Sequence, residues 1–77
     1  MIKIVVHVTT IAEWNSVLNV WFNQGKTWIN GGVGYSEDIF ENGGRYLFLG
    51  NAITWSNDYH HSMPFLEYAD FMKHLPS

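Results

Sequence analysis

The stretch Ile2-Lys3-Ile4-Val5-Val6-His7-Val8-Thr9-Thr10-Ile11-Ala12-Glu13 contains the start of a sheet and the start of a helix. Its first seven residues are β-branched or apolar except for Lys3 and His7, which predicts a central strand. Thr10 and Glu13 have the spacing of a capping box, in which the hydroxyl and the carboxylate each accept a hydrogen bond from a free backbone N–H. The chain is therefore predicted to open with a strand that leads directly into a helix.

Apolar residues recur at helical spacing after this start: Ile11, Trp14, Val17, Leu18 and Trp21. Gly25 suits the left-handed residue that commonly follows a helix end. We therefore predict an amphipathic helix over residues 11–24, with its apolar side packed on a sheet.

The middle of the chain alternates between strand-forming segments and turns. Segments 26–29, 45–49 and 52–55 are rich in β-branched and aromatic residues, which predicts three further strands. Gly50-Asn51 has the signature of a two-residue hairpin. Residues 35–42 carry three of the seven acids and are predicted to form a loop or an irregular edge segment.

The sequence from residue 63 onward permits two interpretations. One is a helix with Pro64 in its first turn. The other is an edge strand over 63–67 followed by a short helix, and we favour this second interpretation.

Together these signals predict an α+β fold: one helix on a small antiparallel sheet of three to four strands, in the order β-α-β-β-β, with a short C-terminal helix in the favoured interpretation. Residues 1–77 would form one globular domain. A domain of this size buries only about 60% of its unfolded surface, so we expect it to associate into a dimer.

The composition excludes several classes of protein. With 47% hydrophobic and 14% charged residues the chain is not intrinsically disordered. It has no apolar run of about 20 residues and no signal-peptide pattern, so we expect no membrane contact. It has no cysteine, which favours a reducing cytoplasm as its location. The net charge is −3 and the cations Lys3, Lys26, Arg45 and Lys73 are scattered, which argues against a nucleic-acid partner.

The sequence contains no complete motif for catalysis or cofactor binding. Gly25-Lys26-Thr27 lacks the earlier glycine of a phosphate-binding loop, since that position is Val20. Asp58, His60 and His61 are the best candidates for a metal or acid–base cluster, but adjacent histidines on an extended chain point to opposite sides. We therefore predict no catalytic residues, no metal site, no cofactor and no enzymatic activity, and whether Asp58, His60 and His61 bind a metal stays open.

The aromatic residues are more numerous than a core of this size needs. The chain has four Trp, four Tyr and five Phe. The helix and central strands can bury Trp14, Leu18, Trp21, Leu47 and Phe48, and some of the remaining rings should reach the surface. Exposed rings among few charges are typical of a contact surface. The predicted partner-binding residues are Trp28, Tyr35, Glu37, Asp38, Phe40, Glu41, Trp55 and Tyr59.

Three segments carry a resemblance: Trp28-Ile29-Asn30-Gly31-Gly32, the run from Arg45 to Ser56 that ends in Ile53-Thr54-Trp55-Ser56, and Phe65-Leu66-Glu67-Tyr68-Ala69-Asp70-Phe71. Together with the strand and helix before them, they resemble the small accessory proteins of tailed bacteriophages. The resemblance implies an early-expressed protein that binds and blocks a host protein, such as a defence system or the transcription machinery, in the host cytoplasm. It implies no catalytic residues.

One alternative function belongs to a different class. The chain could bind a nucleotide signal in a pocket at a dimer interface, with rings stacked on the base. In that case the N–H groups of the glycine turn, together with Lys26 and Arg45, would hold the phosphate.

Overall fold

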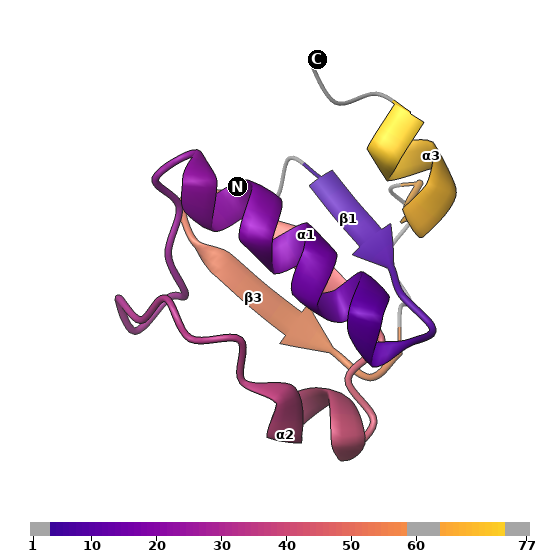
Figure 1. Cartoon of the computed structure of the whole chain (residues 1–77), viewed down its shortest axis with the longest axis horizontal. Helices are drawn as coiled ribbons and strands as arrows, with labels where there is room; N and C mark the ends of the chain where they lie inside the picture. Colours follow the sequence, from indigo (N-terminus) through magenta and orange to yellow (C-terminus); the bar gives the residue numbers. More distant parts are fainter. Residues whose placement is uncertain (1–3, 59–63, 74–77) are drawn as a thin grey trace.

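A computed structural model describes residues 4–58 and 64–73 of the chain. In chain order the elements are β1 (Ile4–His7), α1 (Ile11–Asn23), α2 (Glu37–Glu41), β2 (Tyr46–Leu49), β3 (Ile53–Ser56), β4 (Leu66–Glu67) and α3 (Tyr68–Lys73). The strands form one sheet in the order β3-β2-β1-β4. α1 lies across one face of this sheet, with α3 beside β1 and α2 near the end of β3 (Figure 1). The predicted α+β class is confirmed.

The sheet is mixed, whereas the sequence predicted an antiparallel one. β1 is central and antiparallel to β2, with Val6 opposite Leu47, and β2 is antiparallel to β3. β4 runs parallel to β1, with Val6 opposite Leu66. The chain leaves β3 at one edge of the sheet and enters β4 at the opposite edge, so this connection is a crossover and not a hairpin.

The start and end of α1 follow the sequence signals closely. The Thr10 hydroxyl accepts a hydrogen bond from the Glu13 backbone N–H at 3.1 Å. The Glu13 carboxylate accepts from the backbone N–H of Thr9 at 2.9 Å, one residue before the capping-box position. α1 ends at Asn23, one residue earlier than predicted, and Gly25 then takes a left-handed φ of 84°.

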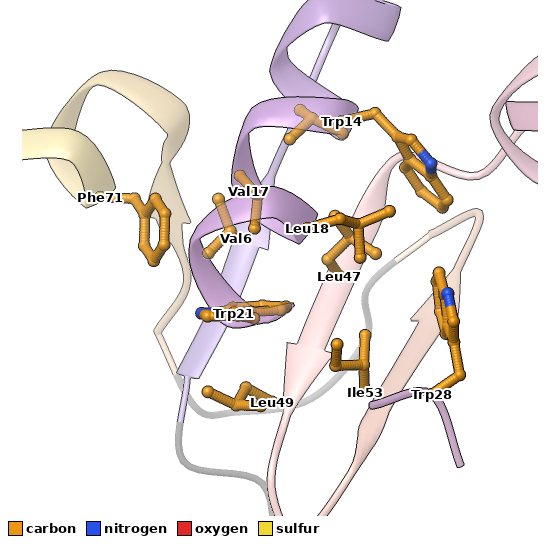
Figure 2. Packing of buried hydrophobic residues seen from close by; sticks show 11 residues of the cluster. Val6, Trp14, Val17, Leu18, Trp21, Trp28, Leu47, Leu49, Ile53 and Phe71 are labelled. Atoms are coloured by element: carbon orange, nitrogen blue, oxygen red, sulfur yellow. The ribbon is translucent and has the colours of Figure 1, made fainter. Parts of the chain in front are cut away.

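The core lies between α1 and the sheet. Trp14, Val17, Leu18 and Trp21 of α1 meet Val6, Leu47, Leu49 and Ile53 of the strands, and Phe71 of α3 and Trp28 lie at the sides of this cluster (Figure 2). The predicted burial of Trp14, Leu18, Trp21, Leu47 and Phe48 is confirmed. Val5 and Phe48 are paired and also buried, but strand alternation places them on the face away from α1.

The predicted strand over 26–29 is wrong. Only Trp28 makes a bridge, to Ile53, and it is a parallel one. The chain then turns away from β3, with the Gly31 N–H donating to the Trp28 carbonyl at 2.7 Å and Gly31 at a φ of 89°. Glycine at this left-handed position stops the strand after one bridge.

Three other predictions concern residues 35–42, the hairpin loop and the C-terminal segment. Residues 35–42, predicted to be irregular, contain the short helix α2. The hairpin has a three-residue loop, because Leu49 pairs with Ile53 and the Gly50 N–H donates to the Ala52 carbonyl at 3.2 Å. At the C-terminus the favoured interpretation is confirmed in the described residues, since a short edge strand precedes a short helix.

Candidate functional site

The segment that follows Trp28 carries the two most exposed large apolar side chains of the described residues. Ile29 is 76% exposed and Val33 is 60% exposed. Tyr35, one of the predicted contact residues, is 41% exposed. We call residues 29–35 the glycine loop. It projects from the body of the domain between α1 and α2 (Figure 1).

Two buried tryptophans hold the glycine loop in place. The indole N–H of Trp28 donates to the Gly34 carbonyl at 2.7 Å, and the indole N–H of Trp14 donates to the Tyr35 carbonyl at 2.6 Å. The two rings lie 6.1 Å apart, centroid to centroid. A buried indole N–H requires an acceptor, and the loop carbonyls supply it. Trp28, a predicted partner-contact residue, is only 7% exposed, and its ring supports the loop from within.

Bonds within the loop and to α1 complete its support. The Trp28 N–H donates to the Gly32 carbonyl at 2.9 Å, and the Gly32 N–H donates to the Asn30 side-chain oxygen at 2.9 Å. The Tyr35 hydroxyl donates to the Asn19 side chain of α1 at 3.2 Å. The Tyr35 ring also packs on Phe22, 5.8 Å between centroids. The apolar side chains of the loop are thus displayed on a well-supported backbone.

α2 continues this surface with acidic side chains. Glu37, Asp38 and Glu41 are all exposed, and the Asn15 amide of α1 donates to Glu37 at 2.6 Å. The oxygen of the same amide is buried, and no donor for it lies among the described residues. Within residues 4–58 and 64–73, no Lys or Arg lies within ion-pair distance of the three carboxylates.

Phe40 has a structural role in addition to its predicted contact role. It is only partly exposed, and its ring lies 5.9 Å from the Trp14 ring. The Arg45 guanidinium lies 4.0 Å from the Phe40 ring centroid and donates to the Phe40 carbonyl at 2.7 Å and to the Gly44 carbonyl at 2.9 Å. Phe40 and Arg45 therefore join α2 to β2.

Trp55 is the remaining predicted ring that the structure describes. It is 44% exposed and lies on the edge strand β3. Ile53, two residues or about 7 Å earlier in the same strand, accepts a hydrogen bond from the Ile29 N–H at the base of the glycine loop. Tyr59, His60 and His61 lie outside the described residues. Asp58 is exposed at the end of β3. The predicted contact residues therefore divide into the glycine loop with α2, and Trp55 nearby on β3.

The sequence reasoning missed a second cluster, on the sheet face away from α1. The His7 ring nitrogen Nδ1 lies 3.1 Å from a carboxylate oxygen of Glu67, and the His7 ring stacks on Tyr46 at 4.7 Å. The Phe65 ring meets both of these rings edge-on, at 5.7 Å and 5.5 Å. The sequence shows His7 as a polar residue in an apolar strand. It does not show that Glu67 is its neighbour, because the two are brought together by the parallel pairing of β4 with β1.

Comparisons with protein families, with curated proteins and with solved structures found no match to this chain. In the described part of the chain no helix has the length and apolar character needed to cross a bilayer. The same residues contain no group of three His, Asp or Glu side chains placed to hold a metal ion. The exposure of Ile29, Val33 and Tyr35 on a backbone held by two indole bonds makes the glycine loop, with α2 beside it in the chain, the candidate site.

Proposed function

We propose that this domain is a non-enzymatic protein-binding module that uses the glycine loop as its contact surface. The observation that carries the proposal is the exposure of Ile29, Val33 and Tyr35 on a backbone held by two buried indoles. In line with the resemblance to phage accessory proteins, the partner would be a host protein that is blocked by this contact in the host cytoplasm.

The hydrogen bonds that hold the glycine loop in one conformation favour tight binding of a partner. A segment that already has its bound conformation loses little conformational entropy on association. Burying an aliphatic side chain such as Ile29 or Val33 in a partner contributes about 1.5–3 kcal/mol. Two such side chains on a preorganised loop form the centre of an interface, and exposed apolar residues gathered in one place mark such surfaces.

The contacts favour a protein partner over a nucleotide. The Gly31 N–H already donates to the Trp28 carbonyl, and the Gly32 N–H donates to the Asn30 side chain. Arg45 donates to two backbone carbonyls and stacks on Phe40. Of the groups that would have held a phosphate, the N–H groups of Gly31 and Gly32 and the Arg45 guanidinium are therefore already engaged within the domain.

The test is site-specific photo-crosslinking in a bacterial lysate. The photo-reactive residue p-benzoylphenylalanine is placed at Val33, and in a matched control at Ala69, which is exposed on α3. We expect the Val33 probe to capture one protein, identified by mass spectrometry, and an excess of unlabelled domain to suppress the product. Equal capture at both positions, or no product at Val33, would contradict the proposed function.

A further inference from the structure

Contacts with α1 place the end of the glycine loop and the start of α2 in one strip along that helix. The Tyr35 ring packs on Phe22 near the C-terminal end of α1, and the Tyr35 hydroxyl bonds to Asn19. One α1 turn earlier, Asn15 bonds to Glu37 at the start of α2. The chain from the glycine loop into α2 therefore follows the side of α1, and the two segments occupy the same edge of the domain (Figure 1).

The charge of this strip is not compensated within the described chain. Three of the seven acids lie on α2, and the nearest cation in the sequence, Arg45, bonds to the Phe40 and Gly44 carbonyls. The surface thus consists of Ile29, Val33 and Tyr35 on the glycine loop, followed along the chain by the three exposed carboxylates of α2. An interface with an apolar centre and a charged rim is matched by a partner with the opposite rim charge.

We propose that the partner of this surface is a protein face with an apolar pocket for Ile29 and Val33 and a rim of Lys or Arg opposite Glu37, Asp38 and Glu41. This inference rests on the proposed function. A second copy of the chain does not supply this basic rim, because its four Lys and Arg residues are scattered along the sequence and Arg45 bonds to backbone carbonyls. A nucleic acid does not suit the surface either, because its phosphates would meet the carboxylates.

A library of random dodecapeptides, displayed on a carrier and selected on the immobilised domain, tests this chemistry and does not require the partner to be identified. We expect enriched peptides that combine aromatic or aliphatic residues with Lys or Arg, and we expect Val33→Asp to abolish the enrichment. The double variant Asp38→Lys with Glu41→Lys should weaken the selected peptides about five- to tenfold, and added salt should weaken them in the wild type. Asp70→Lys, a matched charge reversal on α3, should leave binding unchanged.

The outcomes separate the two proposals. Enrichment of neutral or acidic peptides, no effect of the α2 charge reversal, or no enrichment that depends on Val33 would each overturn the basic partner face. If the Val33 crosslink in lysate still forms in any of these cases, the proposed protein-binding function stands and only the partner chemistry is wrong. Sedimentation that shows a dimer in the wild type and a monomer in Val33→Asp would assign the surface to a second copy and would also overturn the inference.

Discussion

The indole N–H of Trp14 donates to the backbone carbonyl of Tyr35 at 2.6 Å, across 21 residues of sequence. This bond connects a fully buried side chain in the first turn of α1 to the exposed end of the glycine loop. A residue that belongs to the core by its burial therefore also determines where the candidate contact surface lies. The stability of the domain and the conformation of the site depend on the same side chain.

Replacement of Trp14 by phenylalanine tests this connection. Trp14→Phe should lower the free energy of unfolding by about 2–3 kcal/mol, because the Tyr35 carbonyl loses its donor and the smaller ring leaves a cavity. Urea unfolding measures the loss. Trp55→Phe is the matched control, since Trp55 is 44% exposed, and we expect a change below about 0.5 kcal/mol there. Equal losses of unfolding free energy in the two variants would show that Trp14 and its bond to Tyr35 stabilise the domain no more than an exposed tryptophan does.

The structure leaves no room for a side chain at Gly44. A Cβ at this position would lie 2.9 Å from Ile39 Cγ2, 3.0 Å from the Ile39 carbonyl oxygen and 3.3 Å from the Trp14 ring. Gly44→Ala should therefore destabilise the domain by about 1–3 kcal/mol through overpacking between α2 and α1. Gly34→Ala is the comparison, because nothing lies within 4 Å of its Cβ position. Thermal unfolding that ranks the two variants in the reverse order would contradict this packing.

Ser36 has an unfavourable backbone conformation at the start of α2. Its φ of 49° is left-handed, and its side chain makes no capping hydrogen bond. Ser36→Gly should therefore raise the free energy of unfolding by about 0.5–1 kcal/mol, since glycine adopts this φ without steric cost. Ser36→Ala keeps the Cβ and should bring no gain. Both are measured by thermal unfolding, and a gain in the alanine variant would point to the serine side chain as the cause.

The His7–Glu67 pair should contribute modestly to the attachment of β4. The side chains are 24% and 56% exposed, so solvent weakens their interaction. A double-mutant cycle with His7→Gln and Glu67→Gln should give a coupling free energy of about 0.2–1 kcal/mol in urea unfolding. Additive effects of the two single changes would mean that the pair does not hold β4 to β1.

The elements that the sequence predicted well depend on neighbours in the chain. The start of α1 at Thr10, its buried stripe from Trp14 to Trp21 and the left-handed Gly25 follow from capping, periodicity and backbone freedom, which are local properties. The strand at β1 and the hairpin of β2 and β3 follow from alternation and turn residues in the same way.

The amino-acid sequence by itself thus determined the α+β class, the helix on the sheet and the aromatic surplus. Only the tertiary structure decided which rings serve the core and which reach the surface. Trp28 is an aromatic residue next to a glycine turn, which is typical of an exposed contact residue. Its ring is nevertheless buried, because the bridge to Ile53 holds it against β3, 25 residues further along the chain. The parallel β4 and the meeting of His7 with Glu67 likewise depend on a crossover between distant segments. Such pairings are set by the shared burial of residues far apart in the chain, which local pattern and propensity do not encode.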